Sequence, residues 1–218
     1  MPLKYTKNSP VIGVWEIVEP WQDLLGLFQN KTKYDNDVRQ IQSDKRKCEW
    51  LAVRLLVEKL SGAETSVCYR ENGAPFLENS PFNISISHTK GFAAIILSHD
   101  GHPGIDIEYR SGRAMKLTSK YLSEEELNLF DSLPCNYTAD YDAHAPQSTL
   151  ATICWCAKET VYKALQVTDV DFIKHLHIAP FTLSEEGIIS LKETKTTSQN
   201  TYPIHYQVTN GYILTWKE

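Results

Sequence analysis

This sequence lacks the features that mark secreted, membrane-spanning and P-loop proteins. Charged residues interrupt the segment from Met1 to Pro20, so we expect neither a signal peptide nor a membrane span there. No segment matches the glycine-rich pattern G-x-x-x-x-G-K-[ST], which argues against an enzyme that binds a nucleoside triphosphate through such a loop. The function must therefore be sought in other motifs.

Cysteine is scarce, and its spacing gives no pairs. The chain has five cysteines, an odd number, which argues against a disulfide framework. Cys154 and Cys156 form C-x-C with no second pair nearby, so a zinc site is not expected. We predict that all five are reduced thiols in a cytoplasmic protein.

An excess of positive charge is also missing. The 218 residues carry a formal net charge of −5, so we expect no nucleic-acid partner and no membrane partner. Any site for a phosphate must then be a local cluster of basic residues. The length allows one large domain or two small ones, and 42% hydrophobic residues are enough for a substantial core.

Two long helices are predicted. Ser43 is a suitable N-cap and Gly62 a suitable end for a helix over 45–60, in which the leucines recur at helical spacing. A second helix is predicted over 151–166. The segment 134–148 is polar and has no hydrophobic period, so we expect a surface loop there.

Alternating side chains and turn residues predict the strands. The expected strands are 11–17, 67–70, 82–88, 92–97, 105–108, 175–178, 188–191, 204–208 and 212–216. We expect the strands 82–88, 92–97 and 105–108, which are separated by turn residues, to form a three-stranded antiparallel meander. That meander would bring His88 close to the third of these strands.

The run Gly104-Ile105-Asp106-Ile107-Glu108 places two carboxylates on one face of a predicted strand. Ile105 and Ile107 point to the other face, because side chains alternate along a strand. Neighbouring carboxylates need a positive partner, which can be a metal ion, a lysine or an arginine. Magnesium prefers such oxygen ligands. The other interpretation is an amphipathic edge strand with two solvated acids.

Trp155, Glu159 and Lys163 recur every four residues and share one face of the second long helix. Lys158 is the neighbour of Glu159. If this helix meets the acidic strand, three acids and two lysines would form a magnesium–diphosphate centre. The acids would hold the metal, and the lysines would stabilise charge on a leaving phosphate. The other interpretation is a Glu–Lys pair beside a core tryptophan.

Three basic features stand out in an acidic protein. Lys45-Arg46-Lys47 occupies the first turn of a helix, where the helix dipole disfavours cations, so either an anion binds there or the turn is solvated. His88 lies beside a turn and is either a phosphate ligand or a structural histidine. A basic face of Arg110, Arg113, Lys116 and Lys120 either receives an acidic partner or is solvated.

Together these motifs resemble the 4′-phosphopantetheinyl transferase superfamily, in its larger pseudo-dimeric type similar to the activator of surfactin synthetase. The resemblance rests on 83–89, 104–108 and 155–163, which stand in the family's order and at roughly its spacing. It implies an α+β fold of two similar halves, each a small, mostly antiparallel sheet packed against a long helix, with the active site at their interface. The expected halves are 1–100, which binds coenzyme A, and 101–218, which carries the metal site and the catalytic helix. The protein is expected to be a monomer.

The resemblance also implies a reaction, that of a holo-[acyl-carrier-protein] synthase. Coenzyme A, the co-substrate, donates its phosphopantetheine arm to a serine of an acyl or peptidyl carrier protein, and adenosine 3′,5′-bisphosphate leaves. Mg²⁺ is the implied cofactor, with Asp106, Glu108 and Glu159 as its ligands. The implied catalytic residues are Glu159 as the base for the serine, Lys163 at the departing phosphate, and Asp106.

Contacts with coenzyme A are implied for residues of both halves. They are Arg46, Gly73, Pro75, Ser87, His88, Asp106, Lys158 and Lys163. Arg46 would hold the 3′-phosphate, with Lys45 as its rival, and Lys158 would support the diphosphate. The basic face of Arg110, Arg113 and Lys116 would receive the carrier protein, which is typically acidic in this family.

One residue departs from the family pattern. Ala74 stands where the family commonly has the lysine of Gly-Lys-Pro, so we expect Arg70 or Lys90 to compensate.

Two other functions stay open. A non-catalytic module would bind coenzyme A or a carrier protein without transfer. Another magnesium-dependent phosphotransferase or hydrolase would release phosphate from coenzyme A or nucleotides without a protein acceptor.

Overall fold

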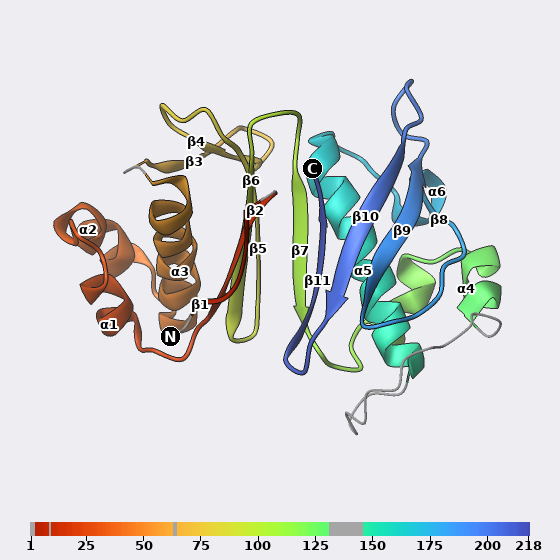
Figure 1. Cartoon of the computed structure of the whole chain (residues 1–218), viewed down its shortest axis with the longest axis horizontal. Coiled ribbons are helices and arrows are strands. Elements are labelled where there is room, and N and C mark those ends of the chain that lie inside the picture. Colours follow the sequence, from red (N-terminus) through yellow and green to blue (C-terminus); the bar gives the residue numbers. More distant parts are fainter. Residues whose placement is uncertain (1–2, 9, 63–64, 131–145) are drawn as a thin grey trace. The chain divides into compact units, whose positions relative to one another are not determined.

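The computed structural model describes residues 3–8, 10–62, 65–130 and 146–218. The chain forms two compact units, Met1–Pro103 and Gly104–Glu218, which we call the N-terminal unit and the C-terminal unit. Each unit has an antiparallel sheet with one long helix packed on it, which confirms a mixed α and β fold (Figure 1). The pseudo-dimeric arrangement and an active site at the interface of two halves stay predictions.

The N-terminal unit contains a four-stranded sheet in the order β1-β2-β6-β5 and a two-stranded β3–β4 hairpin. Its strands are β1 (Leu3–Asn8), β2 (Val11–Glu16), β3 (Val67–Tyr69), β4 (Pro75–Leu77), β5 (Asn83–Thr89) and β6 (Phe92–Ser98). Its helices are α1 (Trp21–Gly26), α2 (Thr32–Gln40) and α3 (Asp44–Ser61). The expected set did not include β1, a polar edge strand, or β4, which has only three residues.

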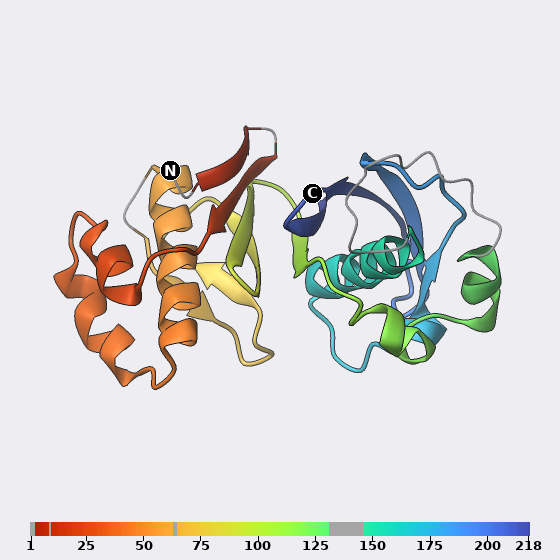
Figure 2. The same cartoon turned by 90° about the horizontal axis from the view of Figure 1, so that it is seen from below.

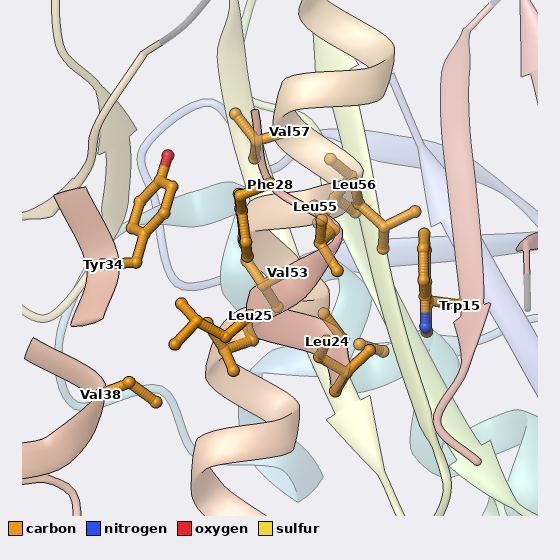
Figure 3. Close-up of a cluster of buried hydrophobic side chains, with 14 of the residues drawn as sticks. Trp15, Leu24, Leu25, Phe28, Tyr34, Val38, Val53, Leu55, Leu56 and Val57 are labelled. Carbon is orange, nitrogen blue, oxygen red and sulfur yellow. The ribbon is translucent and has the colours of Figure 1, made fainter. Parts of the chain in front are cut away.

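Helix α3 is the element on which the N-terminal core is built. The Ser43 side chain caps its first turn, and Gly62 ends it with a φ of 67°, as the sequence predicts. Trp15 of β2 packs with the apolar side chains of α1, α2 and α3 (Figure 3). Gly13 allows the helix to lie close to β2, because a Cβ there would be 2.8 Å from Cδ2 of Leu56.

The C-terminal unit contains a five-stranded sheet in the order β7-β11-β10-β9-β8. Its strands are β7 (Gly104–Tyr109), β8 (Leu176–Ile178), β9 (Glu186–Glu193), β10 (Thr201–Val208) and β11 (Tyr212–Lys217). Its helices are the 3₁₀ helix η1 (Met115–Lys120), α4 (Glu124–Phe130), α5 (Pro146–Leu165) and α6 (Phe172–His175). The sheet curves around α5 (Figure 2).

Helix α5 packs against β7 and β11 on one face of this sheet. The backbones approach closely at Gly104, where an added Cβ would collide with the carbonyl oxygen of Thr160. The Thr160 hydroxyl also lies 2.6 Å from that of Thr215 on β11. Gly104 therefore determines how near the helix comes to β7, the strand that carries Asp106.

The expected three-stranded meander is wrong. Strands β5 and β6 pair as predicted, with Ile86 opposite Ile95, but β6 pairs on its other side with β2. Strand β7 pairs instead with β11, near the end of the chain, with Asp106 opposite Thr215. The prediction placed strands side by side because they are consecutive in the chain. In the structure, β7 joins its sheet by pairing with β11, a strand about a hundred residues later. The argument that brought His88 toward the third strand therefore fails.

The second long helix begins earlier than expected. Helix α5 starts at Pro146, and proline is well suited to the first turn of a helix. Residues 146–148 of the expected loop are therefore helical, and 134–145 lie outside the described residues. A capping box precedes α4, because Ser123 N donates to Glu126 Oε2 at 2.8 Å and Glu126 N donates to Ser123 Oγ at 3.2 Å.

Four of the five cysteines lie in the described residues. Cys48, Cys68, Cys154 and Cys156 are free, and Cys135 lies outside the described residues. In the part of the chain that the structure describes, no helix is both long and apolar enough to cross a membrane.

Candidate active site

Strand β7 presents its two acids to helix α5. Asp106 is buried and Glu108 is half-buried, and Asp106 is bonded to a side chain of α5. Ile105 and Ile107 are buried on the opposite face of the strand. The strand therefore separates acidic from apolar side chains as the sequence predicts.

Lys163 of α5 is the positive partner of Asp106. Its ammonium group donates hydrogen bonds to Asp106 Oδ1 at 2.7 Å and to the carbonyl oxygen of Ile105 at 3.1 Å. The lysine side chain is only 24% exposed, so water screens the pair weakly. The sequence allowed a metal ion, a lysine or an arginine as the positive partner of the acidic strand. The structure shows a lysine in this place.

Glu159 lies one helical turn before Lys163, and its pKa is raised to about 7. Burial is the largest cause, and the charges of Asp106 and Glu108 add to it, whereas Lys163 lowers the pKa. A carboxyl group with a pKa near neutral pH can accept and release a proton readily, as a general base must. We call Asp106, Glu108, Glu159 and Lys163 the acidic cluster.

The acidic cluster has the donor chemistry of a magnesium site. Among the described residues, no group of three or more His, Cys, Asp and Glu is arranged to hold a metal ion as it stands. Magnesium is usually held by one or two carboxylates with water and substrate phosphates, however, and not by an all-protein cage. Burial raises the pKa of Glu159 most, and the charges of Asp106 and Glu108 raise it further, so a cation here would offset part of the shift. The three carboxylates fit this ion, and their role as its ligands stays a prediction.

Cys156 is a neighbour of the acidic cluster that sequence reasoning missed. Its thiol is fully buried and hydrogen-bonded to the carboxylate of Asp106. Burial is the largest cause that raises the pKa of this thiol, followed by the charges of Asp106 and Glu108. The only signal in the sequence is helical spacing, because Cys156, Glu159 and Lys163 recur at three and four residues.

Lys158 was expected to support a diphosphate, but the structure places it outside the acidic cluster. The lysine is fully buried. Its ammonium group donates to Glu126 Oε2 and to the carbonyl oxygens of Tyr121 and Phe172, at 2.7, 2.7 and 3.0 Å. These bonds use all three of its donors. Although Lys158 precedes Glu159 directly, adjacent helical residues point about 100° apart.

The basic face expected after β7 is smaller than the sequence suggested. Arg110 is buried and donates to the carbonyl oxygen of Thr209 and the hydroxyl of Thr149, at 3.3 and 3.2 Å. It therefore holds the fold together and cannot be part of an exposed surface. Arg113 and Lys116 are exposed.

In the N-terminal unit, α3 and β5 form a second charged group. Arg46 donates to Nε2 of His88 at 3.1 Å and lies 3.3 Å from Oε2 of Glu49. Lys45 lies 3.4 Å from the other oxygen of Glu49. Arg46 and Lys45 extend into water, whereas Glu49 is buried. The structure brings the expected Arg46 and His88 together, and sequence reasoning missed Glu49, one helical turn after Arg46.

Ser87 and His88 do not share a surface, because successive residues of a strand point to opposite faces. His88 is exposed and contacts Arg46. Ser87 is buried, with 6% of its surface accessible. The strand therefore directs the two expected coenzyme A contacts to opposite sides of β5.

The β3–β4 hairpin contains the other expected contacts. Gly73 lies in its turn with a φ of 81°, which glycine adopts without strain, and Pro75 begins β4. Arg70 is directly across this turn, since its N–H donates to the carbonyl oxygen of Ala74 at 2.9 Å. Lys90 lies in the separate turn between β5 and β6. Of the two candidates for the missing lysine, only Arg70 shares the turn with Ala74.

Two kinds of comparison with known proteins found similarity to this chain. A family model described as the 4′-phosphopantetheinyl transferase superfamily matches residues 103–217, which include the whole acidic cluster. The chain is 28% identical over 142 residues to the 4′-phosphopantetheinyl transferase AcpT of Salmonella typhimurium, which covers 62% of this chain and 69% of the relative. It is 29% identical over 138 residues to AcpT of Escherichia coli K12, which covers 60% of this chain and 66% of that relative.

Proposed function

Because this chain belongs to the 4′-phosphopantetheinyl transferase superfamily, we propose that it transfers the 4′-phosphopantetheine arm of coenzyme A to a serine hydroxyl of an acyl or peptidyl carrier protein. The serine oxygen bonds to the phosphorus that carries the arm, and the bond from that phosphorus to the bridging oxygen of the diphosphate breaks. The serine proton goes to a base, and adenosine 3′,5′-bisphosphate leaves. The observation that carries the proposal is the acidic cluster, which lies within the matched residues.

Glu159 is the proposed base, acting directly or through a water molecule. Its pKa of about 7 means that much of it is ionised at neutral pH, yet it is more basic than an ordinary carboxylate. Both properties favour removal of the serine proton as the new bond to phosphorus forms. A glutamine at this position could not accept that proton.

Lys163 is the proposed stabiliser of the departing phosphate. Its ammonium group is held by Asp106 and by the carbonyl oxygen of Ile105, which engage two of its three donors. A cation fixed before the reaction needs no reorganisation when negative charge develops on the leaving oxygen. This arrangement supports a role for Lys163 in the chemical step.

Asp106, Glu108 and Glu159 are the proposed ligands of Mg²⁺, with the diphosphate completing its coordination. The ion, when bound, would neutralise charge on the phosphate oxygens. Lys163 holds the carboxylate of Asp106, to which the Cys156 thiol also bonds.

The N-terminal unit is the proposed binding unit for the adenosine bisphosphate part of coenzyme A. Arg46 and His88 would hold the 3′-phosphate, because they adjoin each other at the first turn of α3, where the helix dipole favours an anion. Charge-assisted hydrogen bonds from a guanidinium to a phosphate are among the strong ones. Ser87, which points to the face of β5 opposite His88, is also proposed to contact coenzyme A.

The β3–β4 turn is proposed to complete this binding unit through Gly73 and Pro75. Arg70 is proposed to replace the family's lysine. It is exposed, it lies across the turn from Ala74, and its guanidinium carbon lies 5.1 Å from the centre of the Phe76 ring. Stacking on an aromatic ring limits the motion of an arginine and leaves its N–H groups available for an anion.

An acidic carrier protein is proposed to dock on the segment that contains η1. Arg113 and Lys116 are exposed there, and between them the apolar side chain of Met115 is 44% exposed. This combination suits a partner that offers acidic groups around an apolar patch. Electrostatic steering by the two cations would speed the encounter and weaken as salt is added.

Intact-protein mass spectrometry tests the function directly. The protein is mixed with an apo acyl carrier protein, coenzyme A and Mg²⁺, with EDTA in a parallel reaction. We expect the carrier to gain one phosphopantetheine group in the presence of Mg²⁺ and none with EDTA. Binding of coenzyme A without transfer to any carrier would favour the non-catalytic module, and release of phosphate without a protein acceptor would favour a hydrolase.

A further inference from the structure

The environment of Lys158 is unusual for a lysine. The side chain is 0% exposed, a position that lysine rarely takes unless it is paired. Its partners are one carboxylate, of Glu126, and two carbonyl oxygens, of Tyr121 and Phe172. A buried ion pair is often no more stabilising than well-packed apolar side chains of the same size. Stability alone therefore gives a weak reason for a lysine here.

Glu126 extends these contacts to further elements of the C-terminal unit. Its Oε1 accepts the N–H of Ile178 in β8 at 2.9 Å, and its Oε2 also accepts the N–H of Ser123 at 2.8 Å. Lys158 itself reaches the residue after η1, the helix α4 and the helix α6. One side of α5 is thus tied by a single ion pair to four neighbouring elements.

The neighbouring side of α5 is tied to the sheet by polar contacts as well. Lys163 bonds Asp106 at 2.7 Å, and Thr160 bonds Thr215 at 2.6 Å. A rotation of the helix about its own axis would lengthen the contacts on one side or the other. With both sets formed, the rotation of α5 is fixed, and with it the direction of Glu159.

We propose that the Lys158–Glu126 pair is a positioning device that fixes the rotation of α5 and so directs Glu159 toward Asp106 and Glu108. The structural part of this proposal stands on the contacts alone, and its kinetic consequence rests on the proposed transferase function. Neither Lys158 nor Glu126 touches the acidic cluster in our assignment, so both are positioning residues and not catalytic ones.

The test replaces the pair by neutral residues of similar shape, in the double variant Lys158→Met/Glu126→Gln. Methionine keeps an unbranched apolar stem, and glutamine keeps an oxygen that can accept the N–H of Ile178. We expect kcat to fall about tenfold or more, since a small misplacement of a reacting group costs up to about a hundredfold. The KM for coenzyme A should stay within about twofold, and backbone amides of residues 152–163 should exchange hydrogen faster.

A matched control separates positioning from general loss of stability. Glu193 is also a fully buried carboxylate of the C-terminal unit, but it accepts the N–H groups of Thr196 and Asn200 in the β9–β10 loop. Glu193→Gln should lower the urea midpoint while kcat and the exchange of residues 152–163 stay unchanged. Where the double variant does not fold, Glu126→Gln alone is measured in the same way, with the same expected direction.

Three results of these measurements would decide the proposal in different ways. If the double variant keeps wild-type kcat and wild-type exchange of residues 152–163, the pair is only structural and the proposal is overturned. If exchange rises while kcat is unchanged, the rotation of α5 does not direct Glu159, and the proposal is again overturned. If the wild-type protein transfers no phosphopantetheine, the proposed function fails, and the exchange comparison still decides whether the pair fixes α5.

Discussion

The two units each pack a long helix on an antiparallel sheet, but they differ in what lies between helix and sheet. Most side chains between α3 and the N-terminal sheet are apolar, as Trp15 and Leu55 are (Figure 3), and the charged contact of Glu49 with His88 lies near the start of the helix. Between α5 and β7 the boundary includes Asp106 and Lys163. Apolar contacts are non-directional, whereas buried charges are stable only with their partners in place. The polar boundary is therefore the one that demands fixed positions, as a reactive site does.

The largest expected effect comes from neutralising the base at the polar boundary. Glu159→Gln should lower the transfer rate by about a hundredfold to ten-thousandfold, because loss of a general base typically costs that much. Intact-protein mass spectrometry of the carrier measures the rate, and a urea titration checks that the variant is folded. Glu58→Gln, on the half-buried part of α3, is the control in the apolar unit and should keep the wild-type rate. Full activity of folded Glu159→Gln would contradict the assignment.

The next largest effect compares the glycines at the two helix–sheet boundaries. Gly104→Ala should destabilise the protein by about 1–3 kcal/mol, because its Cβ would meet the backbone oxygen of Thr160, which can move only with the helix. At Gly13 a new Cβ would meet Cδ1 of Leu60 at 2.6 Å, the end of a flexible side chain. Gly13→Ala should therefore change stability by less than about 1 kcal/mol.

The same pair of variants should differ in activity as well. A displaced α5 would carry Glu159 away from β7, so Gly104→Ala should lower kcat by up to about a hundredfold. Gly13→Ala should leave kcat close to the wild-type value. Thermal unfolding and the transfer assay measure the two effects, and equal behaviour of both variants would mean that the close approach at Gly104 does not position the acidic cluster.

The third comparison uses two cations of the same helical turn. Arg46 contacts His88 in our proposed phosphate site, whereas the ammonium group of Lys47 lies 4.8 Å from the centre of the Trp21 ring. Arg46→Ala should weaken coenzyme A binding about tenfold, a typical loss for one charge-assisted hydrogen bond. Lys47→Ala should leave it nearly unchanged. Isothermal titration with coenzyme A and with dephospho-coenzyme A, which lacks the 3′-phosphate, distinguishes this contact from a general effect of charge.

The local parts of this structure could be predicted from the sequence. Strand alternation places Asp106 and Glu108 on one face, and helical spacing places Glu159 one turn from Lys163. The pairing of β7 with β11 could not be predicted, because sequence patterns identify strands and not their distant partners. The role of Lys158 was hidden for the same reason. Glu126 was recognisable as part of a capping box, but only the tertiary fold brings it to a lysine thirty-two residues later.

The smallest expected effect concerns the exposed cations near η1. Arg113→Ala and Lys116→Ala should each lower kcat/KM for the carrier protein by about two- to fivefold, because exposed charges act mainly on the encounter rate and contribute little each. The effect should shrink as salt is raised, since exposed charges are screened over about 10 Å at 0.1 M salt. Lys192→Ala, an exposed lysine of β9, is the control. An equal loss with Lys192→Ala would indicate a response to net charge, and a loss unaffected by salt would indicate that these cations bind the carrier by close contact.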